Sequence, residues 1–277
     1  VLSTETPQER AKALSQIAFW GAVELGLVYA FVALGVYLAF RVLDFPDLTV
    51  AGSFPLGAAL PAVLIIAGVN AWLAALSAMV AVAAAGMVNA MLNVRFKILN
   101  LLASILTMIA LFSVNLRVMG KPNVALINAD TMISPLFGHG LRDFYVRPLF
   151  VGVLVVIAVI VVWRYLESDS GLAMRATGAN ARMARAQGVD TNRQIYLGMA
   201  ISNALVALGG ALFAQTNGFA DVTSGVGTIV VGLAAVIIGE TLLGKRGLLI
   251  ALIGCVIGSI LYLTPLHLAL PPAGISP

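Results

Sequence analysis

The sequence predicts an all-α fold, a polytopic membrane helix bundle of about eight transmembrane helices, and three observations support this. Hydrophobic residues make up 61% of the chain and charged residues only 10%, whereas a soluble domain carries roughly 25% charged residues. The apolar residues also run on without a break, instead of alternating with polar ones as barrel strands do. Only helices and closed barrels satisfy their backbone in lipid, so the long runs predict helices.

One membrane crossing needs about 20 apolar residues, because a helix rises 1.5 Å per residue through a hydrocarbon layer of roughly 30 Å. Residues 1–16 are polar and predict an N-terminal tail without a cleavable signal, and residues 17–277 predict a single transmembrane domain. The charge-free stretches predict spans at 17–40, 50–68, 71–93, 98–118, 148–165, 194–214, 223–242 and 247–264.

Every second loop between the expected spans lies on the same side of the membrane. One such set holds most of the basic residues, and it consists of the loops at Arg41, at Arg95, at 164–193 and at Lys245. Because lysine and arginine are enriched in cytoplasmic loops, these loops are expected in the cytoplasm. The N-terminal tail and the loop 119–147 are then outside.

Few ionisable residues lie within the expected spans, and we expect no metal site and no catalytic residues. Glu24 is expected to reach the outer interface or to cap a neighbour, and Glu240 to form an ion pair with Lys245 or Arg246. A lone cysteine, Cys255, excludes an internal disulfide.

Two segments break the apolar pattern and predict discontinuous helices near 44–55 and 219–228. The first contains two prolines and a glycine, and the second echoes part of it, with D-V-T-S-G-V-G against D-L-T-V-A-G-S. They enter from opposite faces, as in inverted repeats, where half-helix ends and unwound backbone line a polar path. Two ordinary capped helix starts remain the alternative. The candidate path residues are Asp47, Thr49, Gly52, Ser53, Asp221, Thr223 and Ser224.

The cytoplasmic loop 166–193 predicts two short helices. Ser170 or Asp169 caps the first helix, which reaches Arg175. Residues 177–180 make a turn and, with Asn180, a new cap for the second helix, Ala181–Gln187, which Gly188 ends. A capped surface helix rich in alanine and arginine suits a cleft in a soluble partner protein. The same arginines also suit anionic lipid head groups, so composition alone leaves both interpretations open.

The pattern Gly171-x-x-x-Arg175-Ala176-x-Gly178-x-Asn180, followed by Ala184 and Gly188-Val189, resembles the coupling loop of bacterial ABC importer permeases of the branched-chain amino acid and ribose type. The resemblance extends over most of residues 20–265, including D-L-T-V at 47–50 and the runs GGALFA and GLAAVIIGE. DFPDLTVAGSF is most similar to a branch linked with tryptophan or tyrosine uptake.

The resemblance implies a permease subunit of the bacterial plasma membrane that moves a small organic solute, with an amino acid favoured. It implies three partners: ATP-binding subunits, an extracytoplasmic solute-binding protein, and a second permease copy or paralogue. ATP and magnesium belong to the ATP-binding partner, so this chain is expected to hold no cofactor and to be no enzyme. The residues expected to couple to that partner are Gly171, Arg175, Thr177, Gly178, Asn180, Arg182, Ala184 and Gly188.

Two other functions remain open from the residues alone: an ion-coupled secondary transporter, and a non-transporting membrane scaffold. The near absence of ionisable residues in the spans weakens ion coupling. Basic residues spread between apolar runs, rather than gathered on one face, argue against nucleic acid as a partner. The identity of the solute does not follow from the sequence.

Overall fold

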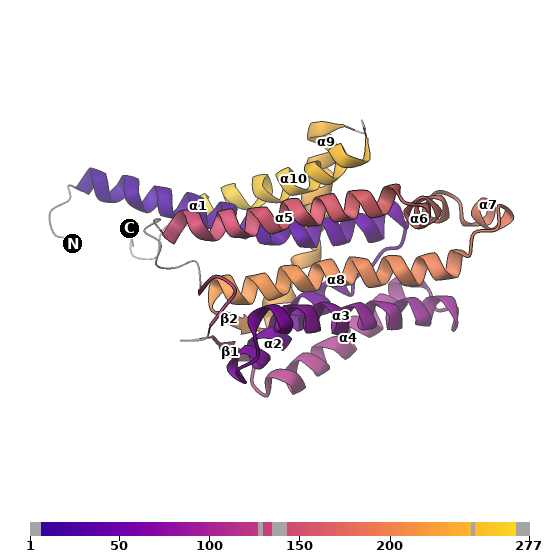
Figure 1. Cartoon of the computed structure of the whole chain (residues 1–277), viewed down its shortest axis with the longest axis horizontal. Coiled ribbons are helices and arrows are strands. Elements are labelled where there is room, and N and C mark those ends of the chain that lie inside the picture. Colours follow the sequence, from indigo (N-terminus) through magenta and orange to yellow (C-terminus); the bar gives the residue numbers. More distant parts are fainter. Residues whose placement is uncertain (1–6, 127–129, 135–142, 245–246, 270–277) are drawn as a thin grey trace.

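A computed structural model describes residues 7–126, 130–134, 143–244 and 247–269 as a bundle of long helices with one small sheet (Figure 1). In chain order the elements are α1 (Pro7–Val36), the π-helix η1 (Tyr37–Val42), α2 (Val50–Ile66), α3 (Ala71–Val94), α4 (Asn100–Met119), β1 (Asn123–Ala125), α5 (Asp143–Glu167), α6 (Asp169–Ala179), α7 (Ala181–Ala186), α8 (Thr191–Asn217), β2 (Phe219–Asp221), the 3₁₀ helix η3 (Val222–Gly225), α9 (Thr228–Leu243) and α10 (Leu248–Ala269).

Seven helical segments among the described residues are long and apolar enough to cross a membrane, and α2 is a shorter apolar helix of 17 residues. Together these account for the eight apolar segments expected from the sequence. The second of them falls short of the roughly 20 residues of a full crossing, because α2 starts at Val50 as expected but ends at Ile66.

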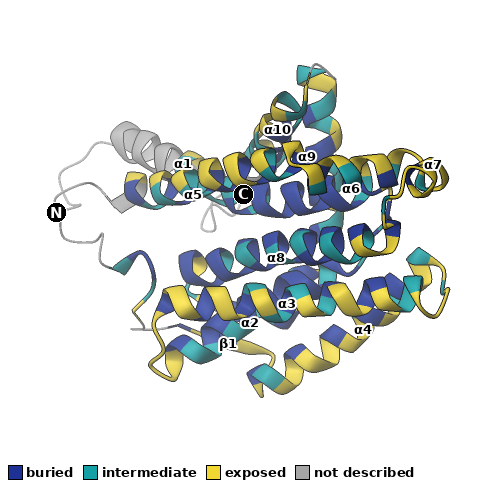
Figure 2. Cartoon of the chain, turned by 45° about the vertical axis from the view of Figure 1, so that its right-hand side comes forward, coloured by how far each residue is buried: buried dark blue, intermediate teal, exposed yellow. Residues whose placement is uncertain are grey.

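The centre of the bundle is formed by α8 and the second half of α1. Helix α8 packs against α3, α2 and α1, and α1 also packs against α10 and α5. In contrast, α3, α4 and α5 each bury one face and expose large apolar side chains on the other, such as Val80, Ile109 and Leu149 (Figure 2). An apolar face of this kind is stable in lipid and not in water.

Small residues set the distance between α2 and α8. A Cβ atom built on Gly57 would lie 2.5 Å from the Cα of Ala207, and one built on Gly210 would lie 2.2 Å from the carbonyl oxygen of Phe54. The two backbones are therefore in direct contact, as the glycine- and alanine-rich runs predict for helices that associate by packing in lipid.

Both expected helix breaks are present. Residues 43–49 follow η1 without helical structure, and β2 with η3 occupies 219–225 before α9 starts at Thr228. The first break is shorter than predicted, because α2 begins at Val50 and tolerates Pro55 close to its N-terminus. A Cβ atom on Gly225 would lie 1.8 Å from the carbonyl oxygen of Ala51, so η3 packs directly against the first turn of α2.

The bundle has two distinct ends. The loop end carries η1, the turn between α3 and α4, and the pair α6–α7; the sheet end carries β1 and β2 (Figure 1). The C-terminus of α9 borders a cavity together with η1 and α6. The antiparallel pair joins Asn123 to Asp221 and Ala125 to Phe219. Three of the loops expected together from their charges, those at Arg41, at Arg95 and at 164–193, thus lie at the loop end, whereas Lys245 and Arg246 of the fourth lie outside the described residues.

Candidate functional site

The first site is a buried polar cluster around Asp47, in the irregular segment before α2. Asp47 has no exposed surface. Its Oδ1 accepts hydrogen bonds from the Thr49 backbone N–H (2.9 Å), the Thr49 hydroxyl (2.5 Å) and Asn89 Nδ2 (3.1 Å), and its Oδ2 accepts one from Asn203 Nδ2 (3.0 Å). Four donors, two from Thr49 in the same segment and one each from α3 and α8, therefore replace the water that this carboxylate would otherwise need.

The cluster extends through side chains that are themselves fully buried. Ser53 donates to Asn203 Oδ1 at 2.6 Å, and Asn89 Nδ2 also contacts the hydroxyl of Ser104 in α4 at 3.2 Å. Asn89 Oδ1 has no partner. The network thus ties the start of α2 to three other helices in the interior of the protein.

The second site lies at the sheet end, around Asp221. Its Oδ1 accepts from the backbone N–H (2.7 Å) and the hydroxyl (2.5 Å) of Thr223, its Oδ2 accepts from Asn123 Nδ2 (3.1 Å), and Ser224 donates to its carbonyl oxygen (2.7 Å). These bonds hold the pKa of the Asp221 carboxyl below its usual range, with the Thr223 hydroxyl as the main cause. The two echoing segments therefore fold into the same Asp-x-Thr turn.

The structure brings the candidate path residues together in two groups. Asp47, Thr49 and Ser53 share the buried cluster, and the neighbouring Gly52 accepts a hydrogen bond from Asn115 and packs against Leu111. The other group is at the sheet end, and it consists of Asp221, Thr223 and Ser224. That either group lines a solute path stays a prediction.

The loop between α5 and α8 forms two short helices, as the sequence predicts, but with a different first cap. Ser168, rather than Ser170 or Asp169, accepts the hydrogen bond from Gly171 N–H (3.4 Å), and α6 continues to Ala179. Asn180 then caps α7 by accepting from the N–H groups of Arg182 and Met183. An asparagine cap followed directly by a second helix fixes the angle between α6 and α7.

The eight expected coupling residues divide by burial. Gly171, Thr177 and Ala184 are buried on the inner sides of α6 and α7, and Gly178 is partly buried. A Cβ atom on Gly171 would lie 2.2 Å from the carbonyl oxygen of Tyr165, so the glycine is needed for α6 to approach α5. The exposed members, which are free to contact another protein, are Arg175, Asn180, Arg182 and Gly188.

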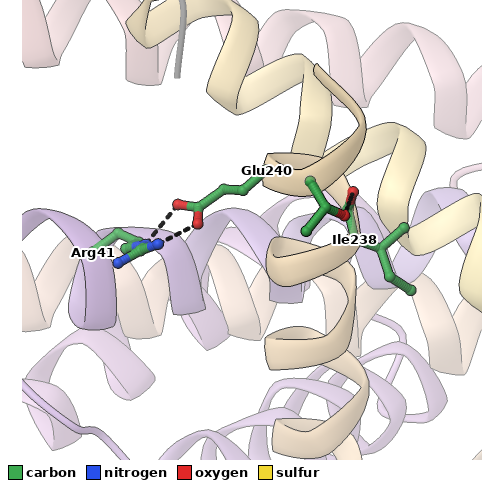
Figure 3. Close-up of polar contacts among 4 residues, drawn as sticks. Arg41, Ile238 and Glu240 are labelled. Atoms are coloured by element: carbon green, nitrogen blue, oxygen red, sulfur yellow. Dashed lines mark hydrogen bonds and ion pairs between the residues drawn. The ribbon is translucent and has the colours of Figure 1, made fainter. Parts of the chain in front are cut away.

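An ion pair joins η1 to α9 at the loop end. Arg41 Nε donates to Glu240 Oε1 at 2.6 Å, and a second bond joins the two groups (Figure 3). The predicted partners of Glu240, Lys245 and Arg246, lie outside the described residues. The prediction of an interfacial ion pair is correct in kind, but the partner is Arg41, which the sequence places 199 positions away.

The ion pair borders a cavity of about 590 Å³ that opens at the loop end. Its wall includes Tyr37 from η1, Arg175 and Gly178 from α6, and Leu248 from α10. The loop that carries the expected coupling residues therefore faces a space between α1, α9 and α10. Within the described ranges, no three His, Cys, Asp or Glu side chains lie together as a metal site would require.

The sequence reasoning missed Asn89, Asn203 and Ser104, which hold Asp47 in place. Each is a polar residue inside an apolar run, in MVNAM, ISNAL and LASIL respectively. A buried amide in a membrane helix usually bonds across to a neighbour, so the two asparagines were detectable as interhelical contacts. Their common partner was not, because Asn203 is 156 positions from Asp47.

Comparison with known proteins supports the interpretation of this architecture. Residues 20–273 match the family described as branched-chain amino acid transport system, permease component. The chain is 36% identical to the tyrosine transport system permease protein of Clostridioides difficile (strain R20291), over 88% of this chain and 80% of that protein. It is 33% identical to an uncharacterized protein of Rickettsia prowazekii (strain Madrid E), over 90% of this chain and 88% of that one. No solved structure matches it significantly.

Three observations agree with one another. The family match covers nearly the whole chain, seven helices among the described residues have the length of a membrane crossing, and a capped loop lies at one end of the bundle. Such permeases work in the plasma membrane with ATP-binding and substrate-binding partners. The chain belongs to the branched-chain amino acid permease family and is a multi-pass permease subunit of an ABC-type importer for a small organic solute.

Proposed function

We propose that this permease imports an amino acid with an aromatic side chain, and that the ATP-binding partner docks on α6–α7. The observation that carries the docking site is the exposed face of this helix pair. Leu172 and Met183 are 51% and 62% exposed there, beside the exposed Arg182. Large apolar side chains mixed with arginine on a capped helix pair are typical of a protein interface.

The underside of the same helix pair is fixed to the bundle. Met174 has no exposed surface, Ala184 is 3% exposed, and Arg185 donates to the Thr191 hydroxyl at the start of α8 at 2.8 Å. A force applied to the outer face of α6–α7 therefore reaches α5 and α8 directly, which is what coupling to ATP hydrolysis requires. On this proposal ATP and magnesium bind to the partner, and this chain itself catalyses no reaction.

The loop end is placed in the cytoplasm, because it gathers the arginine-rich loops. The sheet end then faces the solute-binding protein. A second permease copy or a paralogue completes the transporter, and the solute passes along the surface between the two permeases.

The choice of solute rests on the relative from Clostridioides difficile, whose name assigns it tyrosine. Tyrosine is therefore the first solute to test, with tryptophan and phenylalanine next. Leucine, ribose and a nucleoside serve as comparison solutes, because the wider family resemblance includes them.

Reconstitution in proteoliposomes tests the function. The chain is combined with its cognate ATP-binding subunits and solute-binding protein, and ATP hydrolysis and tyrosine uptake are recorded together. We expect tyrosine and the binding protein to stimulate hydrolysis, and uptake to stop without ATP. Uptake that survives ATP depletion and collapses with the ion gradient would instead indicate a secondary transporter, and no stimulation under any solute would indicate a scaffold.

A charge reversal tests the docking face. Arg182→Glu is expected to lower the stimulated ATP hydrolysis by at least about tenfold, the loss typical of an interface arginine at the centre of a contact. The matched control is Arg95→Glu, because Arg95 is also exposed and lies at the same end of the bundle, at the C-terminus of α3 and outside α6–α7. Equal activity of the two variants would remove α6–α7 as the docking site.

A further inference from the structure

The end of α1 has an unusual backbone. It widens into the π-helix η1, where Leu43 N–H donates to the carbonyl oxygen of Leu38 (3.0 Å) and Phe45 N–H to that of Ala39 (2.9 Å). Asp44 then adopts a φ of +53°, a region that residues other than glycine seldom occupy. Widened turns of this type are frequently found at functional sites.

Helix α6 holds this turn from one side. A Cβ atom on Gly178 would lie 2.0 Å from the carbonyl oxygen of Val42, so the backbones of α6 and η1 touch with no space for a side chain. A Cβ atom on Gly198 of α8 would lie 2.1 Å from Leu43 Cδ1 and 3.2 Å from Met174 Sδ. Met174 of α6 and Leu43 thus meet over Gly198, and α6 cannot shift without pressing on Leu43.

The other end of the segment is fixed. Asp47 is held by Asn203 of α8 and Asn89 of α3, and it has no exposed surface. Only Asp44, Phe45 and Pro46 separate this fixed point from Leu43. A displacement that enters at Leu43 must therefore be absorbed by these three residues or be passed to α1.

Helix α9 is attached on the opposite side of the same turn. The Arg41–Glu240 ion pair joins η1 to the last turns of α9, and both residues line the cavity that α6 also borders. A rotation of η1 would therefore pull the end of α9, whose first residues follow the Asp221 turn at the sheet end. The turn therefore continues α1 and contacts two other elements that border the cavity, α6 and α9.

We propose that residues 43–47 form a hinge, and that Leu43 is the positioning residue through which a movement of α6 reaches α1 and α9. The inference rests on the proposed docking of the ATP-binding partner on α6–α7. It assigns the transmission of that movement to residues outside the docking loop. The buried Asp47 cluster is the fixed side of the hinge, and η1 with the ion pair is the moving side.

The test compares two leucine truncations in the full chain, reconstituted with its ATP-binding subunits and solute-binding protein. Leu43→Ala removes the contact over Gly198, and Leu34→Ala removes another buried leucine from the preceding helix α1, away from α6. We expect Leu43→Ala to lower tyrosine uptake per ATP hydrolysed by at least about fivefold, at the lower end of typical coupling between sites. Leu34→Ala is expected to keep the wild-type ratio of uptake to hydrolysis. If Leu43 had only a structural role, the two truncations would change this ratio equally.

A compensating change sharpens the test. Gly198→Ala alone places a methyl group where Leu43 Cδ1 now lies, so it is expected to lower the ratio as well, whereas Leu43→Ala with Gly198→Ala refills the contact and is expected to restore it. If Leu43→Ala does not reach the membrane, Gly198→Ala alone decides the question.

Two failures are distinguishable. A wild-type ratio in both Leu43→Ala and Gly198→Ala would overturn the hinge, provided that the wild-type protein couples uptake to hydrolysis. If the ATP hydrolysis of the wild-type complex does not respond to any solute, the proposed function itself is overturned.

Discussion

The turns at Asp47 and Asp221 have the same local structure in different surroundings. In each, one carboxylate oxygen accepts from the backbone N–H and the hydroxyl of the threonine two residues later, and the other accepts from an asparagine side chain. Asp47 is completely buried among α2, α3 and α8, whereas Asp221 is partly exposed beside the two-stranded sheet. The comparison shows that a short motif determines a turn, while its surroundings determine how much the turn stabilises the protein.

The difference follows from solvation. A buried carboxylate exchanges water for protein donors, so the loss of either partner leaves a polar group without a substitute. At the sheet end water replaces any donor that is removed. Identical substitutions at the two turns are therefore expected to have unequal effects on the free energy of unfolding.

The largest difference is expected between Asp47→Ala and Asp221→Ala. The first removes one acceptor from each of the buried amides of Asn89 and Asn203, which keep only their bonds to Ser104 and to the carbonyl oxygen of Met199. A buried donor left without an acceptor costs about 1–3 kcal/mol, and two such donors are affected. The second removes an exposed cap and costs about 1 kcal/mol. Denaturation of the detergent-solubilised protein, followed by circular dichroism, measures both. Similar losses in the two variants would show that the Asp47 cluster is hydrated.

Replacing the asparagine partners gives a smaller contrast. Asn203→Leu removes the donor to Asp47 and the acceptor of Ser53, and we expect a loss of about 2–3 kcal/mol, the range for buried hydrogen bonds to charged groups. Asn123→Leu acts on an exposed residue of β1 and is expected to change stability by about 0.5 kcal/mol or less. The same unfolding assay applies, with Asn217→Leu, an exposed asparagine at the end of α8, as a further surface control.

Substitution of the two threonines by valine isolates the hydroxyl groups, because the side-chain shape is kept. Thr49→Val removes a buried hydroxyl that bonds to Asp47 and is expected to cost about 1–2 kcal/mol, while Thr223→Val is expected to cost about 0.5 kcal/mol. Equal values would mean that the backbone N–H bond alone holds both turns.

The sequence predicted the parts of the molecule that depend on near neighbours. Uninterrupted apolar runs predicted the helices, and prolines, glycines and Asp-x-Thr predicted the two breaks, because capping involves residues only two or three positions apart. The cap Asn180 was predicted for the same reason. The first cap was assigned one or two residues late, since Ser168, Asp169 and Ser170 are all capping residue types and only geometry chooses among them.

Contacts between distant parts of the chain were not predictable. The partners of Asp47 come from α3 and α8, and the partner of Glu240 comes from the end of α1, because helix packing rather than sequence spacing brings them together. The sequence identifies Asn203 as a polar residue within an apolar run, but it does not identify the residue that Asn203 contacts. The sequence therefore predicted the two segments that contain Asp47 and Asp221. The arrangement of the other helices around Asp47 depends on the packing of α2 against α8 and was not predicted.

The smallest expected effect is the pH dependence of the Asp221 turn. The hydrogen bonds from Thr223 and Asn123 lower the pKa of this carboxyl in the folded protein, so the folded state favours the ionised form more than the unfolded state does. The contribution is fully present above the unfolded pKa of about 3.9 and is lost as the pH falls through the lower folded pKa. We therefore expect the stability difference between wild type and Asp221→Asn to be constant from pH 7 to about 5 and to shrink below about pH 4. Unfolding measured at each pH tests this, and a difference that grows on acidification would show that protonation strengthens the turn.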